Sequence, residues 1–91
     1  MTTATEFTVT KDRRWFCVEG PDGVEIEDAS YRTLAAMMTN NMDIIDAHLN
    51  GNLKFNEEKI SFLEKEEILS IINKEVIQEQ LEYLGELDDQ N

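Results

Sequence analysis

The sequence is poor in the side chains that most often carry chemistry. It has one cysteine, Cys17, and one histidine, His48. A single cysteine excludes an intramolecular disulfide and a four-thiolate zinc site, and it suits a reducing compartment. Asp46 lies two residues before His48, so on a helix the two would point to different sides and could not work as a pair. We therefore expect a buried, inert thiol at Cys17 and a structural histidine at position 48.

Basic residues are scarce as well. The chain has 8 Lys and Arg against 20 Asp and Glu, which gives a formal net charge of −12. Phosphate backbones and anionic membranes bind to clustered Lys and Arg, so this balance argues against direct binding to nucleic acid or to a membrane. It favours a basic protein partner, imitation of a polyanion, or a role in solubility alone.

Further absences narrow the class of protein. No apolar run reaches the roughly 18 residues of a membrane-spanning helix. The first residues, Met1 to Glu6, lack the basic start and apolar core of a secretory signal. We therefore expect a cytoplasmic protein. Gly20 and Gly23 do not match a nucleotide-binding fingerprint, and no acids have the spacing of a calcium loop. We expect no enzymatic activity, no cofactor and no metal.

The residues that are present indicate one small α+β domain spanning 1–91. After a flexible N-terminus, residues 1–5, alternating β-branched and aromatic side chains predict a three-stranded antiparallel meander within 6–27. In its third strand the alternation places Val24 and Ile26 on the inner face.

The strands are separated by turn sequences. Gly20-Pro21-Asp22-Gly23 is the clearest, because proline presets φ and glycine tolerates positive φ. In the second strand, alternation places Trp15 and Cys17 on one face and Phe16 on the other. Either helices cover both faces of the sheet, or one aromatic side is a contact surface.

Residues 30–49 predict a single helix. The helix would begin with Asp28 or Ser30 as its capping residue and end at Asn50-Gly51. Its apolar side chains recur at helical spacing and form one stripe, which we expect to cover a face of the sheet. The members of this stripe are Tyr31, Leu34, Met38, Met42, Ile45 and Leu49.

Residues 57–87 predict a long acidic helical segment, followed by a solvated tail, 88–91. Apolar side chains at helical spacing, from Ile68 to Leu87, would pack beside the first helix or against a second copy. A break near Glu64 stays open, as does a short strand at Leu53–Phe55 against Ile60 and Phe62. The expected fold is therefore the meander followed by two helices, or by three with the break, the last of them long and acidic.

The acidic segment carries the main functional hypothesis. Between Glu66 and Asn91 there are eight acids and one base, Lys74. Four of the glutamates would form a row that climbs the helix by about 6, 4.5 and 6 Å, comparable to phosphate spacing in nucleic acid. They are Glu75, Glu79, Glu82 and Glu86. We expect a non-enzymatic inhibitor or regulator that engages a basic protein surface, with nucleic-acid mimicry as one form. A solvated helix face is the alternative.

Other interpretations stay open. Arg13, Arg14 and Trp15 combine cations with an aromatic ring, as many interface anchors do. Together with Lys11 they form a cationic turn, which could meet the acidic helix within one molecule or between two copies. A self-assembling adaptor, whose surplus apolar helix faces form a homodimer or larger homo-oligomer, is the second hypothesis. A small-ligand pocket between sheet and helices is the third.

Overall fold

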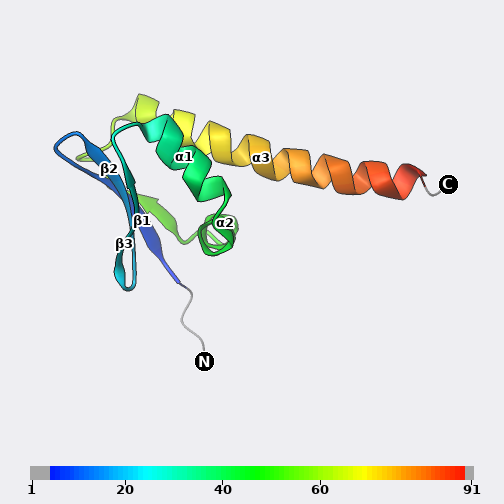
Figure 1. Cartoon of the computed structure of the whole chain (residues 1–91), viewed down its shortest axis with the longest axis horizontal. Helices are drawn as coiled ribbons and strands as arrows, with labels where there is room; N and C mark the ends of the chain where they lie inside the picture. The colour runs from blue at the N-terminus through cyan, green and yellow to red at the C-terminus, as the bar shows by residue number, and fades with distance from the viewer. Residues whose placement is uncertain (1–4, 90–91) are drawn as a thin grey trace.

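The computed structural model describes residues 5–89, with side chains described as far as residue 78. In this part the chain folds into an α+β domain whose sheet lies to one side of its helices, and the last helix is the longest (Figure 1). The predicted fold class is confirmed. The elements are, in order, β1 (Phe7–Asp12), β2 (Trp15–Gly20), β3 (Gly23–Asp28), α1 (Tyr31–Thr39), α2 (Met42–Leu49), β4 (Leu53–Phe55) and α3 (Phe62–Asp89). No helix within these residues has the length and apolar character needed to cross a membrane.

The sheet has the strand order β3-β2-β1-β4. The first three strands form the predicted antiparallel meander. Of the alternatives for Leu53–Phe55, a short strand is present, but it pairs in parallel with β1 and not with Ile60 and Phe62. Leu53 and Phe55 also pack against the core. The backbone N–H of Asn56 extends this pairing with a 2.8 Å hydrogen bond to the carbonyl of Val9.

The turn between β2 and β3 depends on its two glycines. Gly23 has a φ of 115°, a conformation that costs other residues free energy. At Gly20 an added Cβ would lie 2.7 Å from Cε1 of Phe7, so the ring of this core residue occupies the space that a side chain would need. The tight turn predicted from the sequence is confirmed.

A bulge in β3 corrects the expectation that Val24 and Ile26 share a face. Val18 pairs with Ile26 and Glu19 pairs with Val24, so Glu25 is an extra residue in β3. The inserted residue puts the two side chains on opposite faces. Ile26 packs against the core, whereas Val24 is 55% exposed.

The helices gather on one face of the sheet, and the core lies between (Figure 1). α1 packs against β2, β3 and the first turns of α3, and α2 packs against α1 and β4. The core combines residues of the sheet with residues of all three helices. It contains Phe7, Val9, Phe16, Val18, Leu34, Ala35, Met38, Ile44, Ala47, Ile60, Ile68 and Ile72.

The single helix expected over 30–49 is two helices. Ser30 caps α1 as predicted, and Gly51 has the predicted left-handed φ, 77°. Between the helices, however, Asn40 ends α1 and Asn41 begins α2. The side-chain oxygen of Asn41 accepts hydrogen bonds from the backbone N–H groups of Asp43 and Ile44, at 3.0 and 3.2 Å. Asparagine competes in this way with a continuous helix and favours a new N-terminus.

The acidic helical segment begins at Phe62 and not at residue 57. Residues 57–61 form a turn anchored by buried Ile60. Ser61 and Glu64 then bond reciprocally: the N–H of Glu64 donates to Oγ of Ser61 at 3.2 Å, and the N–H of Ser61 donates to Oε1 of Glu64 at 3.0 Å. This capping box fixes the start of α3, close to the break left open near Glu64.

The other end of α3 differs from the expected tail. Asp88 and Asp89 belong to the helix, and residues 90 and 91 lie outside the described residues, as do residues 1–4 of the expected flexible N-terminus. α3 runs well past the rest of the domain (Figure 1). The radius of gyration is accordingly 14.7 Å, against about 12 Å for a compact chain of this length.

Candidate functional site

Most of the described carboxylates form no ion pair with a described base. Among the described side chains three ion pairs form, and all involve α3 or the turn before it. They are Lys11–Glu64 at 3.7 Å, Arg32–Glu67 at 3.2 Å and Lys65–Glu57 at 2.8 Å. The remaining described carboxylates, among them those of Glu58 and Glu66 beside the start of α3, are in no ion pair. They are available to an outside cation.

Two carboxylates of α3 have structural roles. The hydroxyl of Tyr31 donates a 2.7 Å hydrogen bond to Oε2 of Glu67, which lowers the pKa of Glu67 and raises the pKa of Tyr31. The pKa of Glu64 is also lowered, chiefly by the hydrogen bond from the backbone N–H of Ser61. Both groups hold α3 in place, so we exclude them from the candidate site.

The predicted glutamate row begins where α3 leaves the domain. Ile68 and Ile72 are buried, whereas Glu75 is exposed and so is Ile77. The side chains of Glu79, Glu82 and Glu86 lie outside the described side chains. Their backbone belongs to the same uninterrupted helix.

The cluster Arg13, Arg14 and Trp15 lies at the turn between β1 and β2. With Asp12 these residues line an open hollow of about 480 Å³. Arg13 has a φ of 59°, a left-handed conformation that is unfavourable for a residue with a side chain. Both arginines are exposed, and Trp15 is 44% exposed. The three side chains are therefore brought together at one tip of the domain.

This tip and the C-terminal end of α3 lie at opposite ends of the molecule (Figure 1). The longest dimension of the molecule is 53 Å. The cationic turn therefore does not meet the far end of the acidic helix within one chain, and that alternative holds only at the start of α3. Lys11 alone reaches α3, at Glu64 near its start.

The sheet face away from the helices surrounds Cys17 with acids. Phe16 and Val18 point into the core, so alternation places Cys17 on the other face, where it is still buried. Burial raises the pKa of its thiol, and the negative charges of Glu27, Asp12 and Glu19 raise it further. A raised pKa keeps the thiol protonated, which agrees with the expected inert cysteine.

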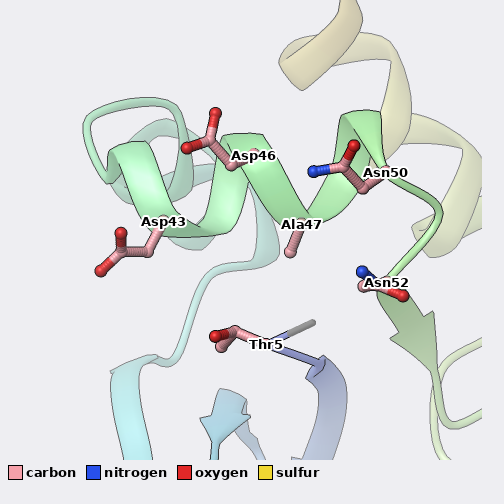
Figure 2. Close-up of a pocket in the computed structure, with 6 residues that line it drawn as sticks. All are labelled: Thr5, Asp43, Asp46, Ala47, Asn50 and Asn52. Carbon is pink, nitrogen blue, oxygen red and sulfur yellow. The ribbon is translucent and has the colours of Figure 1, made fainter. Parts of the chain in front are cut away.

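A second hollow, of about 180 Å³, lies under α2. Figure 2 shows Ala47 directed towards Thr5, while the carboxylates of Asp43 and Asp46 lie on different sides of the helix and do not converge. Asn50 and Asn52 complete the lining. The helical spacing of residues 30–49 did not predict this surface, because it indicated one unbroken helix. The pair Asn40-Asn41, which favours a helix start, was the available signal.

His48 has a structural contact. Its Nε2 lies 2.8 Å from Oδ1 of Asn73, a hydrogen bond that ties the end of α2 to α3. Neither His48 nor Cys17 lines the hollows at the β1–β2 turn and under α2. Among the described side chains no group of three or more His, Cys, Asp or Glu is placed to hold a metal ion.

Comparison of the chain with protein-family models, with curated proteins and with solved structures found no match. The functional interpretation therefore rests on the residues and their geometry.

Proposed function

We propose that this chain is a non-enzymatic binding module that engages a basic surface of a protein partner and acts as its inhibitor or regulator. One observation carries the proposal: three described bases, Lys11, Arg32 and Lys65, pair with acids around the start of α3, while the other described carboxylates are left without an ion pair. Uncompensated surface charge of one sign speeds association with a partner of opposite sign and selects against partners of like sign.

The glutamate row of α3 is the proposed contact. Glu75 is exposed where the helix leaves the domain, and the helix continues without a break to Asp89. At 1.5 Å per residue the 28 residues of α3 span about 40 Å, long enough to cross a basic groove. Imitation of a nucleic-acid strand is one form of this proposal. A cytoplasmic location remains part of it and rests on the sequence alone.

The test compares two variants that have the same net charge, only one of which replaces the glutamate row. The first variant carries Glu75→Gln, Glu79→Gln, Glu82→Gln and Glu86→Gln. The matched control carries the same change at four exposed glutamates of the sheet and of the turn before α3, namely Glu19, Glu25, Glu27 and Glu58. Partners captured from lysate at low and high salt are identified by mass spectrometry. We expect the first variant to lose a salt-sensitive basic partner that the control retains.

Capture of the same partner by both variants would contradict the proposed row. Circular dichroism of the two variants checks that α3 is intact. Removing like charges spaced by three and four residues should leave the helix at least as stable as before, because such charges repel one another.

Self-assembly is the second proposal, and a different surface favours it. Phe62 and Leu63, at the start of α3, are 75% and 67% exposed. Adjacent large apolar side chains in water are typical of an association surface. Sedimentation velocity at low micromolar concentration tests this proposal. A monomer at every salt concentration would contradict it. The third possibility is a small-ligand pocket. None of the described hollows is lined by buried polar groups, which would favour it.

A further inference from the structure

The outward face of α2 is an apolar stripe that the rest of the domain covers only in part, at Ile45. Met42 is 71% exposed and Leu49 is 60% exposed, and Ile45, half-buried, lies between them. The three residues follow the i, i+3, i+7 spacing of one helix face. The opposite face of the same eight-residue helix carries Ile44 and Ala47, which are buried in the core. α2 is thus apolar on both sides: Ile44 and Ala47 are buried, whereas on the outer side only Ile45 packs partly against the core and Met42 and Leu49 remain exposed.

One acidic side chain, that of Asp46, borders this stripe, and a second, that of Asp43, lies farther round the helix. Asp46 follows Met42 by four residues and precedes Leu49 by three, so it neighbours both on the helix surface. Asp43 lies one turn before Asp46 and, with it, lines the hollow under α2 (Figure 2). Both aspartates are exposed, and neither forms an ion pair with a described base. An apolar stripe with free carboxylates nearby is complementary to a ligand that is apolar and cationic.

α3 limits the surface on one side. The hydrogen bond between His48 and Asn73 holds the end of α2 against α3, and Ile77, 54% exposed, lies one helical turn beyond Asn73. Glu75, two residues after Asn73, points to a different side of α3. α2 and the departing helix therefore present exposed apolar side chains on adjacent elements.

We propose that the stripe Met42, Ile45 and Leu49 is a docking site for a cationic amphipathic helix of the protein partner. The inference rests on the proposed function and names the element of the basic partner that would bind here. The apolar side of such a helix would cover the stripe, and its lysine or arginine side chains would reach Asp43 and Asp46. Helices recognised in this way anchor through apolar residues at the same spacing, and a methionine in the stripe adapts to their shape.

Charge favours this occupant over a second copy of the chain. A second copy would bring the same aspartates and a net charge of −12 against the same surface, and like charges facing each other oppose association. The cationic helix replaces this repulsion with attraction.

A pair of designed peptides provides the test. Both peptides consist of about 18 leucine and lysine residues, and the two have the same composition. In one, the leucines recur at helical spacing; in the other, the order is permuted so that they are spread around the helix. Fluorescence anisotropy measures the affinity of each for the full chain. We expect the ordered peptide to bind at least roughly tenfold more tightly than the permuted one.

Variants of the chain locate the site. Met42→Gln with Leu49→Gln should weaken binding of the ordered peptide roughly tenfold. The matched pair Val24→Gln with Met37→Gln, which changes exposed apolar residues elsewhere, should change it less than about twofold. Asp43→Asn with Asp46→Asn should weaken binding and make it less dependent on salt, because fewer ionic contacts remain.

Three results would overturn the inference. Equal affinities for the two peptides would show that charge alone drives binding. Wild-type affinity in the Met42→Gln, Leu49→Gln variant would place the peptide elsewhere. A dimer in sedimentation that this variant dissociates, and that the peptide does not, would make a second copy the occupant.

The four-glutamine variant of α3 separates this inference from the proposed function. If it loses the partner from lysate but still binds the ordered peptide through α2, both proposals stand. If peptide binding requires the α3 glutamates and is indifferent to α2, the α2 site is wrong while the acidic row remains in place.

Discussion

The helices α1 and α2 are neighbours of similar length that meet different surroundings. α1 lies between the sheet and α3, and its Leu34 and Met38 are fully buried. α2 packs against α1 and β4 and touches α3 near its end, so its outer side remains free, with Met42 and Leu49 exposed. Equivalent apolar side chains therefore serve folding in one helix and are available for contact in the other. Helical periodicity alone does not separate these two roles.

The largest test of this contrast is the same substitution made in both helices. Leu34→Ala should lower the free energy of unfolding by about 2–5 kcal/mol, because it leaves a cavity in the packed core. Leu49→Ala should change it by less than about 0.5 kcal/mol, because the side chain is already in water. Urea denaturation of both variants measures the two values. A loss at Leu49 as large as that at Leu34 would mean that the outer face of α2 is buried, for example in a dimer.

The next test removes the cap that separates the helices. Asn41→Ala deletes the two hydrogen bonds from the side chain to the N–H groups of Asp43 and Ile44. We expect a loss of about 1 kcal/mol in the free energy of unfolding. Asn40→Ala is the control, since the Asn40 side chain makes one long bond, 3.3 Å, to the carbonyl of Ala36. The control should cost less than about 0.5 kcal/mol. Equal losses would show that the Asn41 cap does not define the start of α2.

Local patterns predicted most of the fold. The meander follows from alternation and from Gly20-Pro21-Asp22-Gly23, and the cap at Ser30 and the end at Gly51 follow from residue preferences. Each error has a local physical cause. An inserted residue, Glu25, turned Val24 outward, and the side chain of Asn41 started a second helix. Periodicity assumes an unbroken element, so it could not show either change.

The candidate surfaces were predicted less completely. Arg13, Arg14 and Trp15 meet at one turn, as adjacent residues must, whereas the spacing of residues 30–49 did not predict that Asp43 and Asp46 line a hollow beside Thr5. The position of that hollow depends on how α2, which begins after the break at Asn40-Asn41, packs against α1 and β4. That packing is a tertiary property. The glutamate row remains a prediction from spacing, with Glu75 exposed and the other three side chains outside the described ones.

The smallest expected effect concerns the polar contacts that tie each helix to α3. Tyr31→Phe removes the hydroxyl bonded to Glu67 and keeps the ring, which packs edge-on against Phe16 with centroids 5.7 Å apart. We expect the variant to unfold at a slightly lower urea concentration at pH 7. The matched change on the α2 side is Asn73→Ala, which removes the partner of His48.

The pH dependence distinguishes the two contacts. Folding lowers the pKa of Glu67 below its ordinary value of 4.5, so its contribution is present above that pH and is lost as the pH falls through the lower, folded pKa. Folding raises the pKa of Tyr31 above 10.0, so that contribution is present below pH 10.0 and is lost as the pH rises through the folded pKa. The stability difference between the wild type and Tyr31→Phe should therefore be constant from about pH 5 to 10 and shrink on both sides.

The difference for Asn73→Ala should not change between about pH 5 and 3, because no carboxyl group takes part in that contact. Urea midpoints across this range measure both, and a Tyr31→Phe difference that persists unchanged at pH 3 would show that the ionised carboxylate of Glu67 does not hold α1 to α3.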